Sequence, residues 1–332
     1  MRVLFETHPW AFATPGGGER QVIQYAKHLA SYDVDVVLHD HWNSCFGNRG
    51  RSPFFSCIAG SLHFCKFVRE RGLPLVITSS LWVDGETKQL YPIEEIRPQL
   101  ALADVVVTNS RAESVALSKV LGLPPDLFMP VMNGVDSRFA APHDGNAFRK
   151  TFGIEGPFIL NVANIERRKN QLNLMRALSD YDLPLIILGQ VREPAYVEEV
   201  FAEGVGRVRH LRYLDHESPL LASAYAACAA FVLPSTLETP GLAALEAAAA
   251  GAPVVVTRVG ASPEYFGVLC HYVDPADPTD IARGIAAAIE QGPPPDLSAH
   301  VTKNFTWPHV TAALPDVYST AMARRDRRRS AA

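Results

Sequence analysis

Two glutamates, one in a polar loop and one in the helix after it, have types and a spacing that could do chemistry. Residues 234–257 read PSTLETPGLAALEAAAAGAPVVVT, with Glu238 in the loop and Glu246 about one and a half turns into the helix. In a parallel α/β sheet such a loop lies outside the carboxyl end of its strand, where ligands bind. The start of the helix favours an anion such as a diphosphate. The candidate binding residues at this helix start are Thr239, Pro240, Gly241 and Leu242.

A basic loop is the second candidate. Residues 159–178 read ILNVANIERRKNQLNLMRAL, a strand, a loop with three adjacent cations and a helix. A positioned ammonium can stabilise negative charge that develops on a leaving group in a transition state, and Lys169 is the candidate. Without the glutamates, Arg167, Arg168 and Lys169 would instead indicate a solvated surface loop.

The two glutamates resemble the E-x7-E motif of the family 4 retaining glycosyltransferases of GT-B fold, also called glycosyl transferases group 1. Seven residues separate them, and Glu-Ala and Gly-x-Pro-Val follow. The resemblance implies that Glu246 holds the ribose hydroxyls of a nucleotide and that Glu238 lies against the transferred sugar. Two glutamates at this spacing alone would fit an ordinary helix surface. The residues that surround them favour the motif.

The basic loop resembles the phosphate-binding element of the same family, in which Lys169 matches the lysine that contacts the donor diphosphate. The family usually has an arginine where this sequence has Asn164, so that phosphate cation is either missing or supplied by Arg167 or Arg168. We therefore predict Lys169, Glu238 and Arg168 as catalytic residues. Asn164 joins Glu246 among the candidate donor-binding residues.

Three turns carry the resemblance further. The loop PGGGE at residues 15–19 resembles the family's N-terminal Gly-Gly loop, which predicts that Gly17 and Gly18 bind the donor; a plain tight turn is the alternative. GASPE at 260–264 resembles the turn Gly-Gly-x-Pro-Glu, in which Glu264 either contacts the donor or caps a helix. Residues 133–136, NGVD, match the turn that closes the first domain.

The acceptor side departs from the family. Its usual histidine near the fourth strand is absent, and Trp82 there fits a packed aromatic better than a ring-stacking residue. His8, at the end of the first strand, is a weak site candidate. Residues 39–41, His-Asp-His, fall short of a metal-ligand set, and we predict no metal.

Short apolar runs alternate with helical patterns along the chain, which predicts βαβ units around parallel sheets. The predicted strands are residues 3–6, 35–38, 54–59, 75–78, 105–108, 158–162, 185–188, 208–211, 231–233, 254–256 and 269–273. The expected fold is α/β, GT-B, with two Rossmann-like doubly wound domains facing across a cleft. We expect an acceptor domain at 1–150, a donor domain at 151–306, and at 307–332 a helix packing back on the first domain with a basic tail.

Residues 136–156 lack periodicity and contain Pro, Gly, His and Asp, so they are the expected linker. The basic tail, RRDRRR at 324–329, fits a solvated terminus, and a patch for anionic lipid or an anionic acceptor is the alternative. Peripheral membrane contact therefore stays open.

Composition argues against several classes of protein. With 332 residues and a formal net charge of -4, the chain fits two domains and gives no reason to expect a nucleic-acid partner. Five cysteines without C-x-x-C spacing indicate neither a disulfide framework nor a zinc site. Without a leader or a membrane-length apolar run, the expected location is the cytoplasm.

We therefore predict a retaining glycosyltransferase that moves a sugar from a nucleoside-diphosphate sugar, UDP first, to an acceptor hydroxyl without a cofactor. The acceptor could be a glycan, a lipid-linked glycan, a small molecule or a modified base. The alternatives are a non-catalytic nucleotide-sugar-binding subunit and a GT-B nucleotide-sugar epimerase. The donor sugar, the donor base and the oligomeric state stay open.

Overall fold

The chain folds into two compact α/β units. The computed structural model describes residues 1–7, 11–13, 16–39, 52–55, 61–239 and 241–331. The first unit comprises Met1–Gly134 and Trp307–Ala332, and the second comprises Val135–Thr306. Among the described residues, no helix combines the length and the apolar character that crossing a membrane requires.

The first unit is a six-stranded parallel sheet with the strand order β2-β1-β3-β4-β5-β6. Its strands are β1 (Arg2–Thr7), β2 (Asp35–Leu38), β3 (Ser52–Phe55), β4 (Leu75–Thr78), β5 (Val105–Thr108) and β6 (Phe128–Pro130). Its helices are α1 (Gly17–Leu29), α2 (Ser61–Glu70), α3 (Ile93–Leu102), α4 (Arg111–Leu121), α13 (Trp307–Thr311) and α14 (Leu314–Ala331). Short 3-10 helices are η1 (Ala11–Ala13), η2 (Ala30–Tyr32), η3 (Lys88–Leu90) and η4 (Pro125–Leu127).

The second unit is also a six-stranded parallel sheet, with the strand order β12-β11-β10-β7-β8-β9. Its strands are β7 (Ile159–Val162), β8 (Leu185–Leu188), β9 (Val208–His210), β10 (Ala230–Leu233), β11 (Val254–Thr257) and β12 (His271–Val273). Its helices are α5 (Gly145–Phe152), α6 (Gln171–Ala177), α7 (Pro194–Glu203), α8 (Pro219–Ala227), α9 (Leu242–Ala249), α10 (Ser262–Phe266), α11 (Pro278–Gln291) and α12 (Leu297–Asn304). Its 3-10 helices are η5 (Ser137–Ala140) and η6 (Arg167–Lys169).

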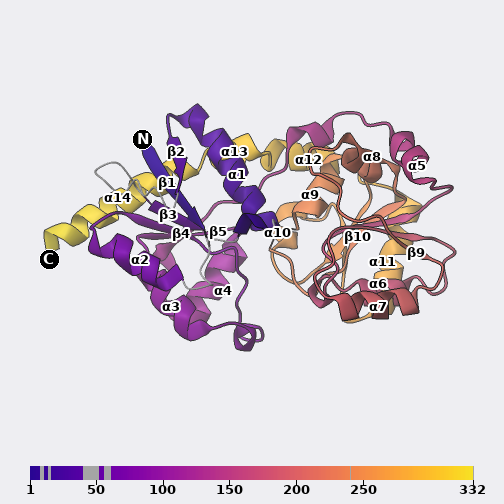
Figure 1. Ribbon diagram of the computed structural model, residues 1–332, viewed down its shortest axis with the longest axis horizontal. Coiled ribbons are helices and arrows are strands. Elements are labelled where there is room, and N and C mark those ends of the chain that lie inside the picture. The colour runs from indigo at the N-terminus through magenta and orange to yellow at the C-terminus, as the bar shows by residue number, and fades with distance from the viewer. Residues whose placement is uncertain (8–10, 14–15, 40–51, 56–60, 240, 332) are drawn as a thin grey trace. The chain divides into compact units, whose positions relative to one another are not determined.

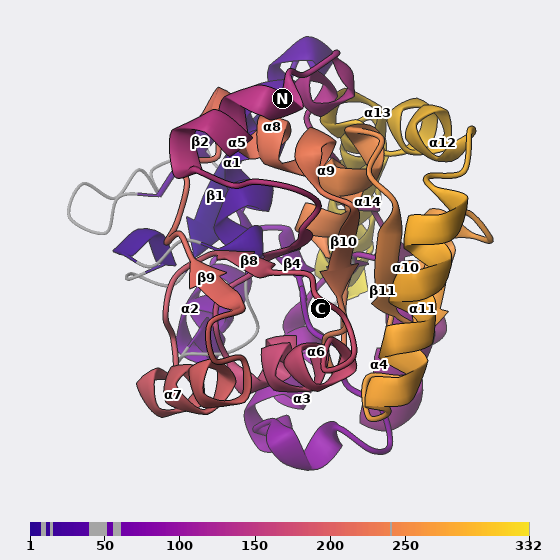
Figure 2. The same cartoon turned by 90° about the vertical axis from the view of Figure 1, so that its right-hand side faces the viewer.

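Helices cover both faces of the second sheet, so its central strands are buried on both sides. Figure 1 shows α6, α7 and α11 on one face and α5, α8, α9 and α12 on the other. Figure 2 shows α11 running alongside β11. This two-sided cover explains why the central strands read as continuous apolar runs, such as LIIL in β8 and AFVL in β10, without alternation.

The α6, α7 and α11 face carries a continuous core. Leu174 of α6, Val200 of α7 and Ile285 of α11 are fully buried against Ile187 of β8 and Val232 of β10. A comparable cluster fills the first unit, where α2, α3 and α4 pack on β4 and β5. Burial of these side chains is the main favourable contribution to folding of each unit.

The unit boundary differs from the predicted domain boundary. The predicted boundary at residue 150 moves to Gly134–Val135, because residues 136–156 contain η5 and α5 and are no free linker. Phe148 of α5 is fully buried, and its backbone N–H donates to Ser223 Oγ of α8 at 2.9 Å. The buried face of α5 therefore makes it part of the second unit.

The basic tail also differs from a solvated terminus, because it forms the last turns of α14. Arg328 pairs with the buried carboxylate of Asp104, and Arg324 donates to the carbonyl oxygens of Asp104 at 3.0 Å and Asp126 at 2.7 Å. These contacts are within the first unit, to which the residues after Thr306 belong.

Candidate active site

The strand order of the second unit brings two loops together at the carboxyl edge of its sheet. The chain builds outward from β7 through β8 to β9, then crosses back and builds outward from β10 in the other direction. β7 and β10 are therefore neighbours, with Ala230 opposite Ile159. The loops that follow these two strands carry the predicted site residues. In a doubly wound sheet this switch point is where ligands bind.

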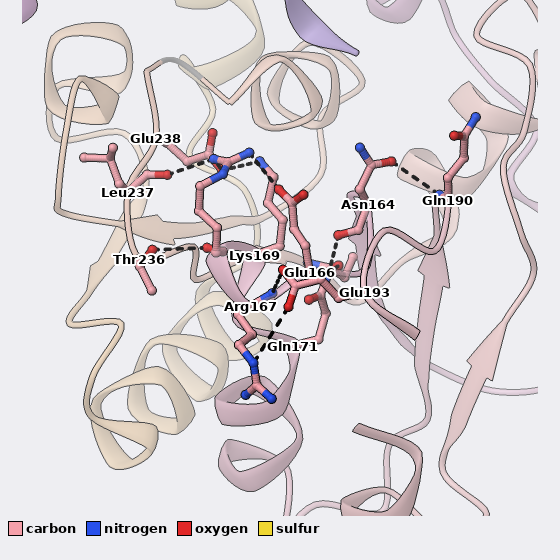
Figure 3. Close-up of polar contacts among 12 residues, drawn as sticks. Asn164, Glu166, Arg167, Lys169, Gln171, Gln190, Glu193, Thr236, Leu237 and Glu238 are labelled. Carbon is pink, nitrogen blue, oxygen red and sulfur yellow. Dashed lines mark hydrogen bonds and ion pairs between the residues drawn. The ribbon is translucent and has the colours of Figure 1, made fainter. Parts of the chain in front are cut away.

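Lys169 and Glu238 meet at this point from the two loops (Figure 3). Lys169 Nζ donates to Glu238 Oε1 at 2.5 Å, and the two side chains are 14% and 6% exposed. Burial by itself raises the pKa of Glu238, but Lys169 and Arg168 outweigh it and hold that pKa below the usual value. Burial lowers the pKa of Lys169, and the Glu238 carboxylate partly offsets this. The site thus contains a desolvated cation beside an ionised carboxylate.

The backbone of Glu238 is fixed by the loop after β11. Its N–H donates to the Val259 carbonyl at 3.2 Å, and its carbonyl accepts from the Ala261 N–H at 2.8 Å. Gly260 between them has φ +103°, and a Cβ built there would lie 2.1 Å from the Glu238 carbonyl oxygen. Only glycine permits this approach, so the glycine of the GASPE turn positions Glu238.

The Lys169 loop is tied to the same edge. Asn170 adopts a left-handed conformation with φ +61°, and its Nδ2 donates to the carbonyls of Pro234 at 2.9 Å and Pro275 at 2.7 Å. The Thr236 N–H donates to the Arg168 carbonyl at 2.9 Å. Backbone groups of the two loops therefore hold Lys169 opposite Glu238.

The two arginines of the basic loop separate. Arg167 points away from Glu238, pairs with Glu199 and Glu193, and lies over the Tyr196 ring at 5.1 Å (Figure 3). Arg168 Nη1 lies 3.9 Å from Glu238 Oε1, and its Nη2 donates to Glu166 at 2.9 Å. Of the two predicted sources of extra phosphate charge, Arg168 is the one beside the Lys169–Glu238 pair.

Asn164 stabilises the conformation of the basic loop through hydrogen bonds. Its Oδ1 accepts from the Gln190 N–H at 3.4 Å, and its carbonyl accepts from Gln171 Nε2 at 2.9 Å. At the start of α9, Gly241 has φ +67° and Leu242 is the first helical residue, while Thr239 is half-buried in the preceding bend. Pro240 lies outside the described residues.

Glu246 of α9 is buried, and its carboxylate is contacted on both oxygens. His216 Nε2 lies 2.6 Å from Oε1, and the Tyr225 hydroxyl donates to Oε2 at 2.8 Å. Burial and the Glu246 carboxylate raise the pKa of Tyr225 well above its usual value, so this phenol stays protonated and donates. Arg138 in turn contacts His216 Nδ1 and its carbonyl, and pairs with Glu217.

Sequence reasoning missed His216, Tyr225 and Arg138. His216 lies 30 residues before Glu246, and Arg138 lies 78 residues before His216 in what resembled a linker. No spacing rule connects positions so far apart, and a histidine that follows a Leu-Asp pair belongs to no motif. Their association is a product of α8 and η5 packing beside α9.

The first unit, taken by itself, contains several of the predicted site residues. Gly17 and Gly18 are exposed residues that begin α1. Trp82 Nε1 donates to Asp84 Oδ2 at 2.8 Å, which fits a structural aromatic. His39 contacts the buried Glu6, whose pKa burial raises to about 7. His8, Asp40 and His41 lie outside the described residues.

Comparisons with known proteins agree with this geometry. Residues 156–291 match the family described as Glycosyl transferases group 1. The D-inositol 3-phosphate glycosyltransferase 1 of Catenulispora acidiphila is 30% identical over 325 residues, which are 87% of this chain and 73% of that protein. The crystal structure of Anabaena Alr3699/HepE in complex with UDP-glucose has a TM-score of 0.78 and 20% identity, covering 96% of this chain and 100% of that one. Sucrose-phosphate synthase from Thermosynechococcus elongatus has a TM-score of 0.76 and 18% identity, covering 97% and 99%.

The two parallel doubly wound cores match the GT-B fold. The chain belongs to the glycosyl transferases group 1 family. It transfers a sugar from a nucleotide-sugar donor, and the predictions of fold, family and enzyme class are confirmed.

Proposed function

We propose that this glycosyltransferase uses a UDP-sugar held by its second unit and transfers the sugar to an acceptor hydroxyl with retention of anomeric configuration. The observation that carries the proposal is the buried Lys169–Glu238 pair at the switch point, with Glu246 on the helix that follows. The structurally similar Anabaena protein was crystallised with UDP-glucose, which supports UDP as the donor nucleotide.

In this proposal Lys169 and Arg168 stabilise the leaving diphosphate. An ammonium has three N–H donors, and Lys169 uses one on Glu238, so others can reach phosphate oxygens. Charge develops on those oxygens as the glycosidic bond breaks, and a positioned cation in a partly desolvated site stabilises that charge strongly. Arg168, 3.9 Å from Glu238, adds a second positive charge.

The two glutamates have different roles in this proposal. Glu238 lies against the transferred sugar, and its ionised carboxylate can accept sugar hydroxyls. Glu246 accepts the ribose hydroxyls. Thr239, Gly241 and Leu242 bring the start of α9 to the phosphates, where the helix dipole favours an anion, and Pro240, a further predicted contact, lies outside the described residues. The leaving phosphate helps to accept the acceptor proton, so no protein base is named.

Thermal stabilisation and hydrolysis of UDP-, GDP- and ADP-sugars test the proposal. The wild type is compared with Lys169→Ala and Glu246→Ala, and with Lys303→Ala and Glu155→Ala as exposed controls of the second unit. Stabilisation by UDP-sugars that both site variants lose and both controls keep is expected. Stabilisation by no donor, or stabilisation that both site variants keep, would overturn the assignment. Binding without hydrolysis or transfer would instead indicate a nucleotide-sugar-binding subunit.

A further inference from the structure

Glu246 is held by two donors, one on each carboxylate oxygen. His216 Nε2 is 2.6 Å from Oε1 and the Tyr225 hydroxyl is 2.8 Å from Oε2. The outer C–C torsion of a glutamate has a broad energy profile, so one contact leaves the carboxylate plane free to turn, whereas two contacts fix it. Each carboxylate oxygen has about two acceptor sites, so each oxygen can still accept a ligand hydroxyl.

The contacts of Arg138 and Glu246 together determine which nitrogen of His216 carries the proton. Arg138 Nη2 contacts Nδ1, and a guanidinium can only donate, so Nδ1 must accept. The neutral ring therefore carries its proton on Nε2, the nitrogen that faces Glu246. Arg138 is itself oriented by Glu217, by the His216 carbonyl and by the Phe139 ring, 5.1 Å from its guanidinium carbon.

We propose that Arg138 and His216 are positioning residues that hold the Glu246 carboxylate in the plane that recognises a vicinal diol. Preference of this site for a ribonucleotide over a deoxyribonucleotide then depends on His216, although His216 itself need not touch the ligand. The inference rests on the proposed function, in which Glu246 receives the ribose of the donor.

The expected effect is selective. A hydrogen bond to a charged group accounts for roughly a tenfold change in affinity, so His216→Ala weakens UDP binding by about that factor. The affinity of His216→Ala for 3′-deoxy-UDP, which lacks one of the two hydroxyls, falls much less. A merely structural loss would weaken both ligands equally.

Isothermal titration of the full chain with UDP, 2′-deoxy-UDP and 3′-deoxy-UDP tests this. His300→Ala is the matched control, since His300 is also half-buried in the second unit and its Nε2 is 2.9 Å from the Tyr265 carbonyl. Wild type and the control should prefer UDP, and His216→Ala should lose that preference. A wild type without preference would refute the role of Glu246 in the proposed function. A preference that His216→Ala retains would refute the present inference alone.

The double variant His216→Ala with Glu246→Gln separates positioning from direct contact. If His216 acts through Glu246, the double variant binds UDP no more weakly than Glu246→Gln. Losses of UDP affinity that add in the double variant would show that His216 contributes independently of Glu246. That result would overturn the proposal that His216 acts through Glu246.

Nitrogen-15 spectra of the His216 imidazole test the contacts from Arg138 to His216 and from His216 to Glu246 without any ligand. At a pH where the ring is neutral, His216 should carry its proton on Nε2, and Arg138→Met should shift the population toward the other tautomer. A wild-type ring protonated on Nδ1, or a tautomer unaffected by Arg138→Met in a folded variant, would contradict the assigned geometry.

Discussion

Replacing Lys169 by methionine should destabilise the second unit and nearly abolish turnover, because it leaves Glu238 buried without its main partner. The two charges are 2.5 Å apart, and at an effective dielectric constant of about 20 they attract by roughly 7 kcal/mol. Most of this offsets the cost of removing both groups from water. Deleting one member of such a pair typically costs about 3 kcal/mol, which is roughly a 10 °C fall in Tm for a unit of this size.

Arg168 compensates only slightly in this variant, because its half-exposed guanidinium is 3.9 Å from Glu238 and is screened by solvent. Loss of a donor that stabilises developing charge lowers kcat by about 100- to 1,000-fold. Arg167→Met is the matched control, since Arg167 is in the same loop and pairs with Glu199 instead.

The destabilisation should depend on pH. In the wild type the pKa of Glu238 lies below 4.5, so the pair stabilises the fold above that pH and loses this effect as the pH falls through the lowered pKa. Without Lys169, burial dominates and raises the pKa of Glu238, so the variant loses stability as the pH rises through that higher value. The difference in unfolding free energy is therefore largest near neutral pH and shrinks toward acid.

Denaturant unfolding of both proteins at neutral and acid pH, together with initial rates of UDP-sugar hydrolysis, measures these quantities. The reasoning is refuted if Lys169→Met unfolds like the wild type at neutral pH and keeps kcat within a few-fold. A deficit in stability that grows toward acid would contradict the assigned pKa direction of Glu238.

Three further predictions follow from contacts within the units. Arg168→Ala should lower kcat by about tenfold or more, whereas Arg167→Ala leaves kcat within a few-fold, and steady-state hydrolysis rates compare them. Gly260→Ala should destabilise by roughly 3 kcal/mol or more, because a Cβ would lie 2.1 Å from the Glu238 carbonyl oxygen; an unchanged Tm would refute this close approach. Asp104→Ala should cost about 3 kcal/mol, because this carboxylate, 2% exposed, accepts from Arg69, Arg328 and a backbone N–H, and calorimetric unfolding measures the loss.

Most strands of both sheets were predictable from sequence, although β3 begins two residues before the predicted strand 54–59, of which residues 56–59 lie outside the described residues. A strand buried on both faces must be apolar at every position, so segments such as VVVT in β5 and β11 are visible without tertiary information. The three-residue strand β6 escaped prediction, because a run of three residues ending in proline carries little periodicity.

The meeting of Lys169 and Glu238 was predictable for a related reason. Lys169 and Glu238 each lie just after a central strand, and the carboxyl edge of a parallel sheet gathers such loops. Sequence thus named the residues of the pair. Their separation and burial, and hence the lowered pKa of Glu238, depend on two further contacts. Asn170 binds the loop that carries Glu238, and Gly260 of the loop after β11 packs against the Glu238 backbone.

Tertiary structure alone decided the surroundings of Glu246 and the use of the arginines. His216 reaches Glu246, and Arg138 reaches His216, only because η5, α8 and the loop before α8 pack beside α9, which no local pattern encodes. Likewise, Arg167 and Arg168 are adjacent in sequence, yet one pairs with Glu199 and the other lies beside Glu238. Sequence determines which side chains carry charge and which segments must be buried. The direction in which each charge points is set by long-range packing, because a side chain pairs with whichever partner the fold brings within reach.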